Sequence, residues 1–251
     1  MKEYITGTLM VRVYETRAEM GAAAAKDIAA EIKRLLAAKD EINMIFAAAP
    51  SQNDVLACLR EDKTIPWEKV NAFHMDEYIG LTEDAPQSFA RFLKDAIFDR
   101  LPFKSVNLIR GGEDPEKECA RYAALLQKYP ADIVVMGIGE NGHVAFNDPP
   151  VADFNDPKVI KPVKLDEVCR MQQVHDKCFP DIGSVPEYAL SLTVPTLMRA
   201  GARFCIVPCL TKAEAVKKTL TGPVGETCPA TAMRVTERSI MYCDRDSASL
   251  L

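Results

Sequence analysis

MGIGENGHVAFNDPP, at residues 136–150, begins at the end of an apolar run, IVVM, at residues 133–136. Its glycines have the G-x-G-x-x-G spacing of a dinucleotide-binding fingerprint, in which the third glycine opens a helix whose N-terminus holds a pyrophosphate. Here Asn-Asp-Pro-Pro at residues 147–150 stops any helix that begins at the last glycine. The stretch therefore predicts a strand, a glycine loop and a short excursion, and it disfavours a dinucleotide site.

The same order of strand, loop and helix is repeated along the chain. A Thr-Arg-Ala-Glu capping box opens the first expected helix, at residues 16–39, and apolar residues follow it at helical spacing. Further helices are expected at residues 55–60, 88–101, 114–129, 196–200 and 211–220. Strands are expected at residues 42–48, 70–74, 106–109, 133–136, 188–193, 204–208 and 239–243. Such alternation predicts an α/β fold with a mostly parallel sheet covered by helices on both faces.

The bulk composition limits the classes of function. The chain has 251 residues and a formal net charge of -5, without a basic stripe, so a nucleic acid is not expected as a partner. No apolar run is long enough to cross a membrane and the first residues do not form a signal segment, so we expect a cytoplasmic protein without a membrane partner. No linker or change of composition divides the sequence, which predicts one domain over residues 1–251.

The cysteines do not indicate a metal centre or a disulfide framework. The chain has eight cysteines, which occur singly and mostly in apolar contexts. In a chain of this size without a signal segment, buried reduced thiols are expected. Cys205 and Cys209 are four residues apart, but no further pair completes a zinc site. We therefore expect no metal.

In open α/β sheets ligands lie beyond the carboxyl ends of the strands, and this rule selects five segments. They are residues 50–54, 75–80, 137–148, 163–186 and 209–212. In the second segment Asp76 and Glu77 follow an expected strand, where neighbouring side chains point to opposite sides. One carboxylate can therefore face a cleft while the other anchors the loop. In the third segment His143 lies on the glycine loop, with Asp148 close enough to orient its imidazole.

Three motifs resemble the glucosamine-6-phosphate deaminase (isomerase) family: MDEYIGL at residues 75–81, GIGENGHVAFNDPP at residues 137–150 and VPEYALSLTVPTLM at residues 185–198. Their order, spacing and strand context agree with that family across nearly the whole chain. The resemblance implies a Rossmann-like three-layer αβα sandwich and an aldose-to-ketose isomerisation with loss of ammonia. It also implies a sugar phosphate substrate in amino sugar metabolism, the absence of any cofactor, and a possible homo-oligomer.

The resemblance also assigns roles to individual residues. Asp76 matches the general base that moves a proton from C2 to C1 of the open-chain sugar, and His143 matches the histidine that opens the ring. Lys212, in the first turn of a helix that Thr211 is expected to cap, matches a phosphate-binding lysine, at a helix N-terminus that itself favours anions. The further expected substrate-binding residues are Ser51, Gln52, Asn53, Glu77, Gly139 and Gly142.

The sequence departs from the family pattern at three places. The family usually reads Asn-Asp-Gly-His, whereas Asn141 here replaces the carboxylate before Gly142, and Asp148 replaces a glutamate. Asn141 and Asp148 remain candidates for orienting the imidazole, although a neutral partner stabilises an imidazolium less. APSQND at residues 49–54 replaces a Gly-Gly-Thr phosphate loop. Asp54 would repel a phosphate if it faced the site, but as the N3 partner of a helix-capping Ser51 it would face the backbone instead.

The third departure is the family's phosphate-binding arginine, which has no clear counterpart near Arg170. Two alternative functions therefore stay open. One is a 6-phosphogluconolactonase-like hydrolase, although that branch resembles Asp-Glu-Arg where this chain has Tyr78 after Glu77. The other is a non-catalytic sugar-phosphate sensor, which would keep the cavity without turnover.

Overall fold

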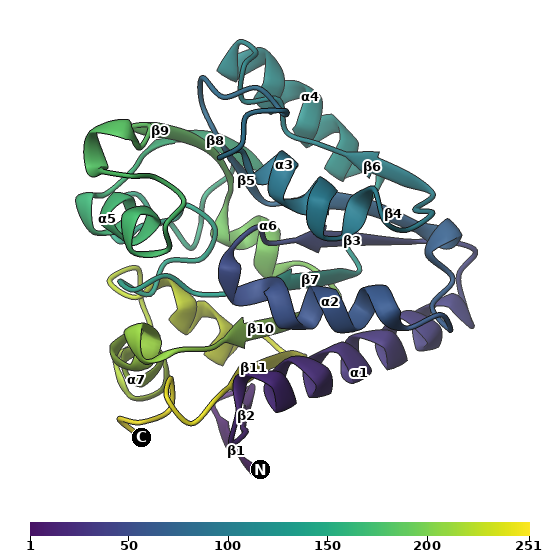
Figure 1. Ribbon diagram of the computed structural model, residues 1–251, viewed down its shortest axis with the longest axis vertical. Coiled ribbons are helices and arrows are strands. Elements are labelled where there is room, and N and C mark those ends of the chain that lie inside the picture. The colour runs from purple at the N-terminus through teal and green to yellow at the C-terminus, as the bar shows by residue number, and fades with distance from the viewer.

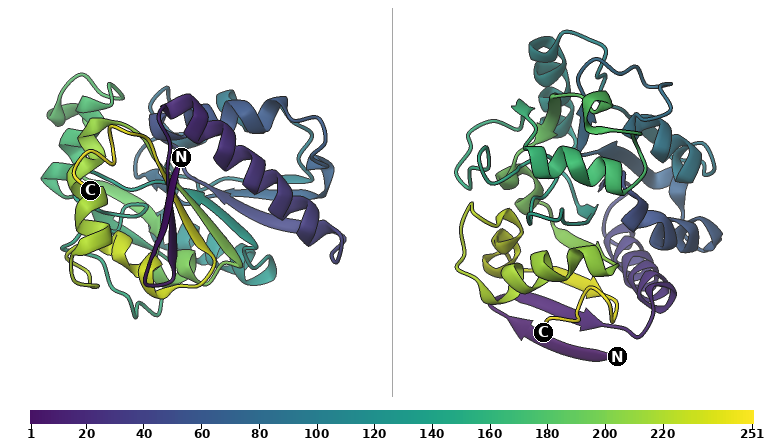
Figure 2. Two further views of the ribbon diagram at one scale, coloured as in Figure 1. Left: turned by 90° about the horizontal axis from the view of Figure 1, so that it is seen from below. Right: turned by 60° about the vertical axis from the view of Figure 1, so that its left-hand side comes forward.

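The computed structural model describes residues 1–251, and its centre is an eight-stranded sheet with the order β1-β2-β11-β10-β7-β3-β4-β6 (Figure 1). Its strands are β1 (Lys2–Thr6), β2 (Leu9–Val13), β3 (Ile42–Phe46), β4 (Val70–His74), β6 (Ser105–Asn107), β7 (Ile133–Met136), β10 (Ala202–Val207) and β11 (Ser239–Cys243). Every neighbouring pair is parallel except β1 and β2, which form an antiparallel hairpin at one edge (Figure 2). The mostly parallel sheet is confirmed, whereas the hairpin was not expected from the sequence.

Helices cover both faces of this sheet. They are α1 (Arg17–Leu36), α2 (Asn53–Glu61), α3 (Phe89–Leu93), α4 (Pro115–Lys128), α5 (Glu167–His175), α6 (Val194–Met198) and α7 (Ala213–Thr221). One hydrophobic cluster joins α1, α2 and α3 to Met44 and Phe46 of β3, and a second joins α4, α6 and α7 to Ile45 of the same strand. Because successive strand residues face opposite sides, this division confirms the three-layer αβα sandwich.

The first helix shows how local sequence fixes an element. Thr16 caps α1 by accepting a hydrogen bond from the backbone N–H of Glu19 at 3.2 Å. Met20, Ala24, Ile28 and Ile32 then follow at intervals of four residues and are fully buried.

No helix in the structure is long and apolar enough to cross a membrane.

Two expected helices are built differently from the prediction. The helix expected at residues 88–101 is divided into α3 and a π-helical turn, η3 (Lys94–Phe98). The helix expected at residues 211–220 begins with a 3-10 turn, η5 (Leu210–Lys212), before α7. Thr211 therefore lies inside η5 and does not cap α7, contrary to the prediction.

A second, three-stranded sheet lies beyond the carboxyl end of β4. It consists of β5 (Asp76–Tyr78), β9 (Tyr188–Leu192) and β8 (Ile160–Lys164), and both of its pairings are antiparallel. The strand expected at residues 188–193 thus exists, but it does not belong to the main sheet. A hydrogen bond from the backbone N–H of Leu192 to the Met75 carbonyl, 2.8 Å long, joins β9 to the end of β4.

Glu77 anchors the loop that follows β5. Its carboxylate is buried and accepts hydrogen bonds from the backbone N–H groups of Tyr78, Phe89 and Ala90, at 2.8 to 3.1 Å. Two of these groups belong to the first turn of α3, where a carboxylate satisfies N–H groups that lack helical partners. Burial raises the pKa of Glu77 to about 7, although these hydrogen bonds oppose the rise.

Glu77→Ala is expected to lower the free energy of unfolding by about 2–4 kcal/mol, because three buried N–H groups lose their acceptor. Chemical denaturation followed by circular dichroism measures the change. Glu113→Gln is the matched control, since Glu113 is exposed. An unfolding free energy that is equal in the Glu77→Ala and control proteins would contradict the anchoring role.

Candidate active site

A cavity lies at the carboxyl ends of β3, β4, β7 and β10. All five segments selected from the sequence contribute residues to its lining. The lining includes six of the predicted site residues, namely Ser51, Gln52, Asp76, Gly139, His143 and Lys212. The other five, Asn53, Glu77, Asn141, Gly142 and Asp148, lie outside the lining. The lining also includes Arg17, Gln172, Gln173, Asp176 and Cys209, which were not identified as site residues from the sequence.

Asp76 and Glu77 separate as the strand geometry predicts. Asp76 lines the cavity, whereas Glu77 points into the protein and binds backbone N–H groups of α3. Asp76 is 7% exposed. Burial raises the pKa of its carboxyl group well above the ordinary value, and the neighbouring charge of Glu77 raises it further. A carboxylate in such a place binds a proton strongly, as a general base must.

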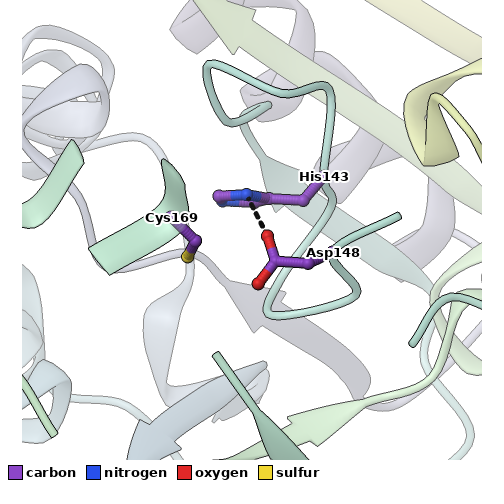
Figure 3. A group of neighbouring side chains, drawn as sticks. All are labelled: His143, Asp148 and Cys169. Carbon is purple, nitrogen blue, oxygen red and sulfur yellow. Dashed lines mark ion pairs between the residues drawn. The ribbon is translucent and has the colours of Figure 1, made fainter. Parts of the chain in front are cut away.

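His143, which lines the cavity, forms a close pair with Asp148. Nδ1 of His143 lies 2.8 Å from Oδ1 of Asp148, and Asp148 is fully buried (Figure 3). Burial alone would raise the pKa of Asp148, but His143, Asn141 and the backbone N–H of Asp166 outweigh it and lower the pKa below its ordinary value. Asp148 is therefore an ionised carboxylate beside the imidazole ring.

Asn141 does not contact the imidazole ring. Its Oδ1 accepts a hydrogen bond from the backbone N–H of His143, and its Nδ2 donates one to Oδ1 of Asp148, both at 3.0 Å. The negative charge that Asn141 lacks is thus supplied by Asp148. Asn141 instead fixes the turn that carries the histidine and helps to hold the carboxylate.

The glycines of this loop are required by close approach. Gly142 has φ 84, and a Cβ there would lie 2.5 Å from Sγ of Cys228. At Gly139 a Cβ would lie 2.1 Å from the imidazole of His143. Gly139 therefore makes room for the histidine ring, and Gly142 lets the loop pack against Cys228.

Two residues that the sequence analysis missed hold the histidine loop against the small sheet. The Ser191 hydroxyl accepts a hydrogen bond from the backbone N–H of Phe146 at 3.0 Å. Asn147 donates from Nδ2 to the carbonyls of Val144 and Leu192, both at 2.8 Å. The available signals were a serine inside the apolar stretch ALSL and a buried amide before two prolines.

Cys169 of α5 lies beside the His143–Asp148 pair (Figure 3). A ring nitrogen of His143, a carboxylate oxygen of Asp148 and Sγ of Cys169 lie within 4.8 Å of one another. Burial raises the pKa of the Cys169 thiol well above its ordinary value. Because zinc binds the thiolate, this environment is a poor one for a metal ligand.

Lys212 is a cationic residue in the lining of the same cavity. Its side chain is 6% exposed and its Nζ has no hydrogen-bond partner in the protein. Burial lowers the pKa of the ammonium group, and the carboxylates of Asp176 and Glu140 oppose this shift. Nearby, Gln52 is fully buried and donates from Nε2 to the Ser51 hydroxyl at 3.0 Å. An unpaired buried cation beside polar groups is suited to an anion.

The expected capping role of Ser51 and the expected backbone partner of Asp54 were wrong. Ser51 does not cap a helix, and Asp54 forms an ion pair with Arg17 instead of binding the backbone. Arg170, the arginine considered from the sequence, does not line the cavity. Its Nη2 donates to the carbonyls of Ile182 and Val185, at 2.7 and 2.8 Å, and so joins α5 to the following loop.

Comparison with known proteins identifies the family of the chain. Residues 15–242 match the family model of glucosamine-6-phosphate isomerases/6-phosphogluconolactonase. The glucosamine-6-phosphate deaminase of Bacillus thuringiensis (strain Al Hakam) is 32% identical over 220 residues, which cover 87% of this chain and 82% of that protein.

Solved structures show the same fold. A monomeric glucosamine-6-phosphate deaminase matches with a TM-score of 0.87 and 29% identity, over 96% of this chain and 99% of that chain. The 6-phosphogluconolactonase of Trypanosoma brucei matches with a TM-score of 0.80 over 100% of both chains, but its 17% identity supports the fold alone. The chain belongs to the family of glucosamine-6-phosphate isomerases and 6-phosphogluconolactonases.

Proposed function

We propose that this protein isomerises and deaminates a 6-phosphorylated amino sugar, converting glucosamine 6-phosphate, or its galactosamine analogue, into the ketose phosphate and ammonia. The observation that carries the proposal is one cavity lined by a buried carboxyl group, Asp76, a carboxylate-paired histidine, His143, and an unpaired buried ammonium, Lys212. The 32% identity to a glucosamine-6-phosphate deaminase supports the same reaction.

The first step assigns His143 to ring opening. The imidazolium gives a proton to the ring oxygen, the imidazole that results accepts the proton of the anomeric hydroxyl, and the ring opens to the aldehyde form. The ionised carboxylate of Asp148 at 2.8 Å stabilises the imidazolium form and fixes its direction. Asn141 supports both groups through the contacts described above.

The second step assigns Asp76 to proton transfer. Its carboxylate removes the proton from C2 while the His143 imidazolium gives a proton to O1, which leaves an enolamine. Asp76 then returns its proton to C1, which gives a protonated imine at C2. One group suffices because it must accept a proton and then deliver it over a short distance. Hydrolysis of the resulting imine at C2 releases ammonia and leaves fructose 6-phosphate or its analogue. The proposed reaction uses neither a metal nor an organic cofactor.

We assign the phosphate to the part of the cavity that Lys212, Ser51 and Gln52 line. Lys212 supplies the positive charge, and Ser51 and Gln52 supply hydrogen-bond donors from the loop after β3. Asn53 and Glu77 lie outside the lining, so we assign them to the loop and to α3 rather than to substrate contact. We further propose that residues 1–251 act as one domain in the cytoplasm.

Ammonia release tests the proposal directly. We expect release from glucosamine 6-phosphate or galactosamine 6-phosphate in a coupled glutamate dehydrogenase assay. Asp76→Asn should lower kcat about 10²–10⁴-fold, because the general base is removed, while ligand binding persists. Asp99→Asn, at an exposed position, is the control.

Folded protein that releases no ammonia from either sugar would overturn the proposed reaction. Hydrolysis of 6-phosphogluconolactone by the same protein would then support the hydrolase alternative. Binding of the sugar phosphates without any turnover would support the sensor alternative.

The pH dependence tests the environment of Asp76. Because burial and Glu77 raise the pKa of Asp76, the ionised base should form only above the ordinary range of a carboxyl group. The kcat/KM of the proposed reaction should therefore rise with pH along its acid limb. Glu77→Gln removes the neighbouring negative charge, so it should shift this limb to lower pH. A limb that stays in place, or that moves to higher pH, would contradict the coupling of the two groups.

A further inference from the structure

Arg17 is a second cationic side chain in the lining of the cavity. It is the first residue of α1, far in the sequence from Lys212 and from the α5 region. Its guanidinium group is about one-third exposed, with a side-chain exposure of 32%. Arginine has five N–H donors in a planar fork and matches a phosphate group better than lysine does.

Three contacts fix the position of this guanidinium group. Nε binds the Asp54 carboxylate, Nη2 donates to the Pro50 carbonyl, and Nη1 lies 3.4 Å from Sγ of Cys209. These contacts use three of the five N–H donors and leave two for a ligand. Asp54 and Pro50 belong to the segment after β3, and Cys209 to the segment after β10. The guanidinium is therefore held between the two loops that carry Ser51 and Lys212.

Cys209 connects the two cations. The backbone N–H of Lys212 donates to the Cys209 carbonyl at 3.1 Å, while the Cys209 side chain contacts Arg17. The backbone N–H of Cys209 in turn donates to the carboxylate of Asp244, at 3.0 and 3.2 Å. Cys209 therefore links the side chain of Arg17 to the backbone of Lys212. The guanidinium group of Arg17 has protein partners, whereas Nζ of Lys212 has no hydrogen-bond partner.

Gly21 explains how Asp54 reaches Arg17. A Cβ at Gly21 would lie 2.6 Å from Cβ of Asp54, so glycine is needed for α1 to pack this closely on the first turn of α2. Asp54 is thereby directed to Arg17 and its charge is neutralised by the guanidinium. The acidic residue that would otherwise repel an anion in this loop becomes the support of a cation.

We propose that Arg17 and Lys212 together bind the phosphate of the substrate, and that Arg17 makes the site prefer phosphorylated over unphosphorylated sugars. This inference rests on the proposed function for the sugar, whereas inorganic phosphate can probe the anion site independently. Asp176 also lines the cavity, and its Oδ2 lies 3.3 Å from Nε2 of Gln172, which donates to it. Its negative charge opposes phosphate binding, so the balance of the two cations against Asp176 sets the affinity.

The test measures the Kd of inorganic phosphate by isothermal titration calorimetry. Arg17→Gln should raise this Kd about tenfold or more, and Arg17→Lys should raise it less, because the charge remains but the fork is lost. Arg34→Gln is the matched control, since Arg34 lies on the same helix and pairs with Glu31 outside the cavity. Asp176→Asn should change the Kd in the opposite direction and lower it.

With an active enzyme, Arg17→Gln should raise KM for the sugar phosphate about tenfold and change kcat much less. Arg17→Gln protein that has the control's phosphate Kd and only a lower Tm would overturn the inference, since Arg17 would then merely join α1 to α2. Wild-type protein that binds no phosphate at millimolar concentrations would also overturn it. If wild-type protein binds phosphate but releases no ammonia, the proposed function fails, and the Kd comparison still decides the role of Arg17.

Discussion

The junction between the small sheet and the end of β4 holds the candidate site together. The backbone N–H of Leu192 binds the Met75 carbonyl directly before Asp76, and the neighbouring Ser191 binds the histidine loop at Phe146. One strand, β9, thus fixes the positions of both Asp76 and His143. The parallel sheet brings the strand ends to one edge, but this antiparallel addition positions Asp76 and His143 relative to each other.

The two buried acids of the site, Asp76 and Asp148, have pKa values that are shifted in opposite directions. Burial raises the pKa of Asp76, and the negative charge of Glu77 raises it further. Asp148 is also buried, but His143, Asn141 and a backbone N–H group stabilise its charge and lower its pKa. In the proposed mechanism this difference separates the roles, because a proton acceptor must bind its proton strongly and an imidazole partner must remain ionised.

The sequence predicted the features that depend on local periodicity and on the ends of strands. Alternating helices and strands indicated a mostly parallel sheet with helices on both faces, and all five segments that the strand-end rule selected contribute residues to the lining of the cavity. The small sheet could not be predicted in this way, because β5 and β9 pair across more than a hundred residues. Arg17 was missed for the same reason: it appears as an ordinary first-turn residue until Asp54 and Cys209 fold against it. The expected capping roles of Ser51 and Thr211 failed because 3-10 turns precede both helices.

In the proposed mechanism one buried carboxyl group, that of Asp76, moves the proton from C2 to C1. This transfer can be tested with amino sugar phosphate that carries deuterium at C2, followed by NMR of the ketose phosphate. Because Asp76 is 7% exposed, its proton should exchange slowly enough with water for a measurable share of the deuterium to reach C1. Hydrogen at C1 that derives entirely from solvent would contradict the account.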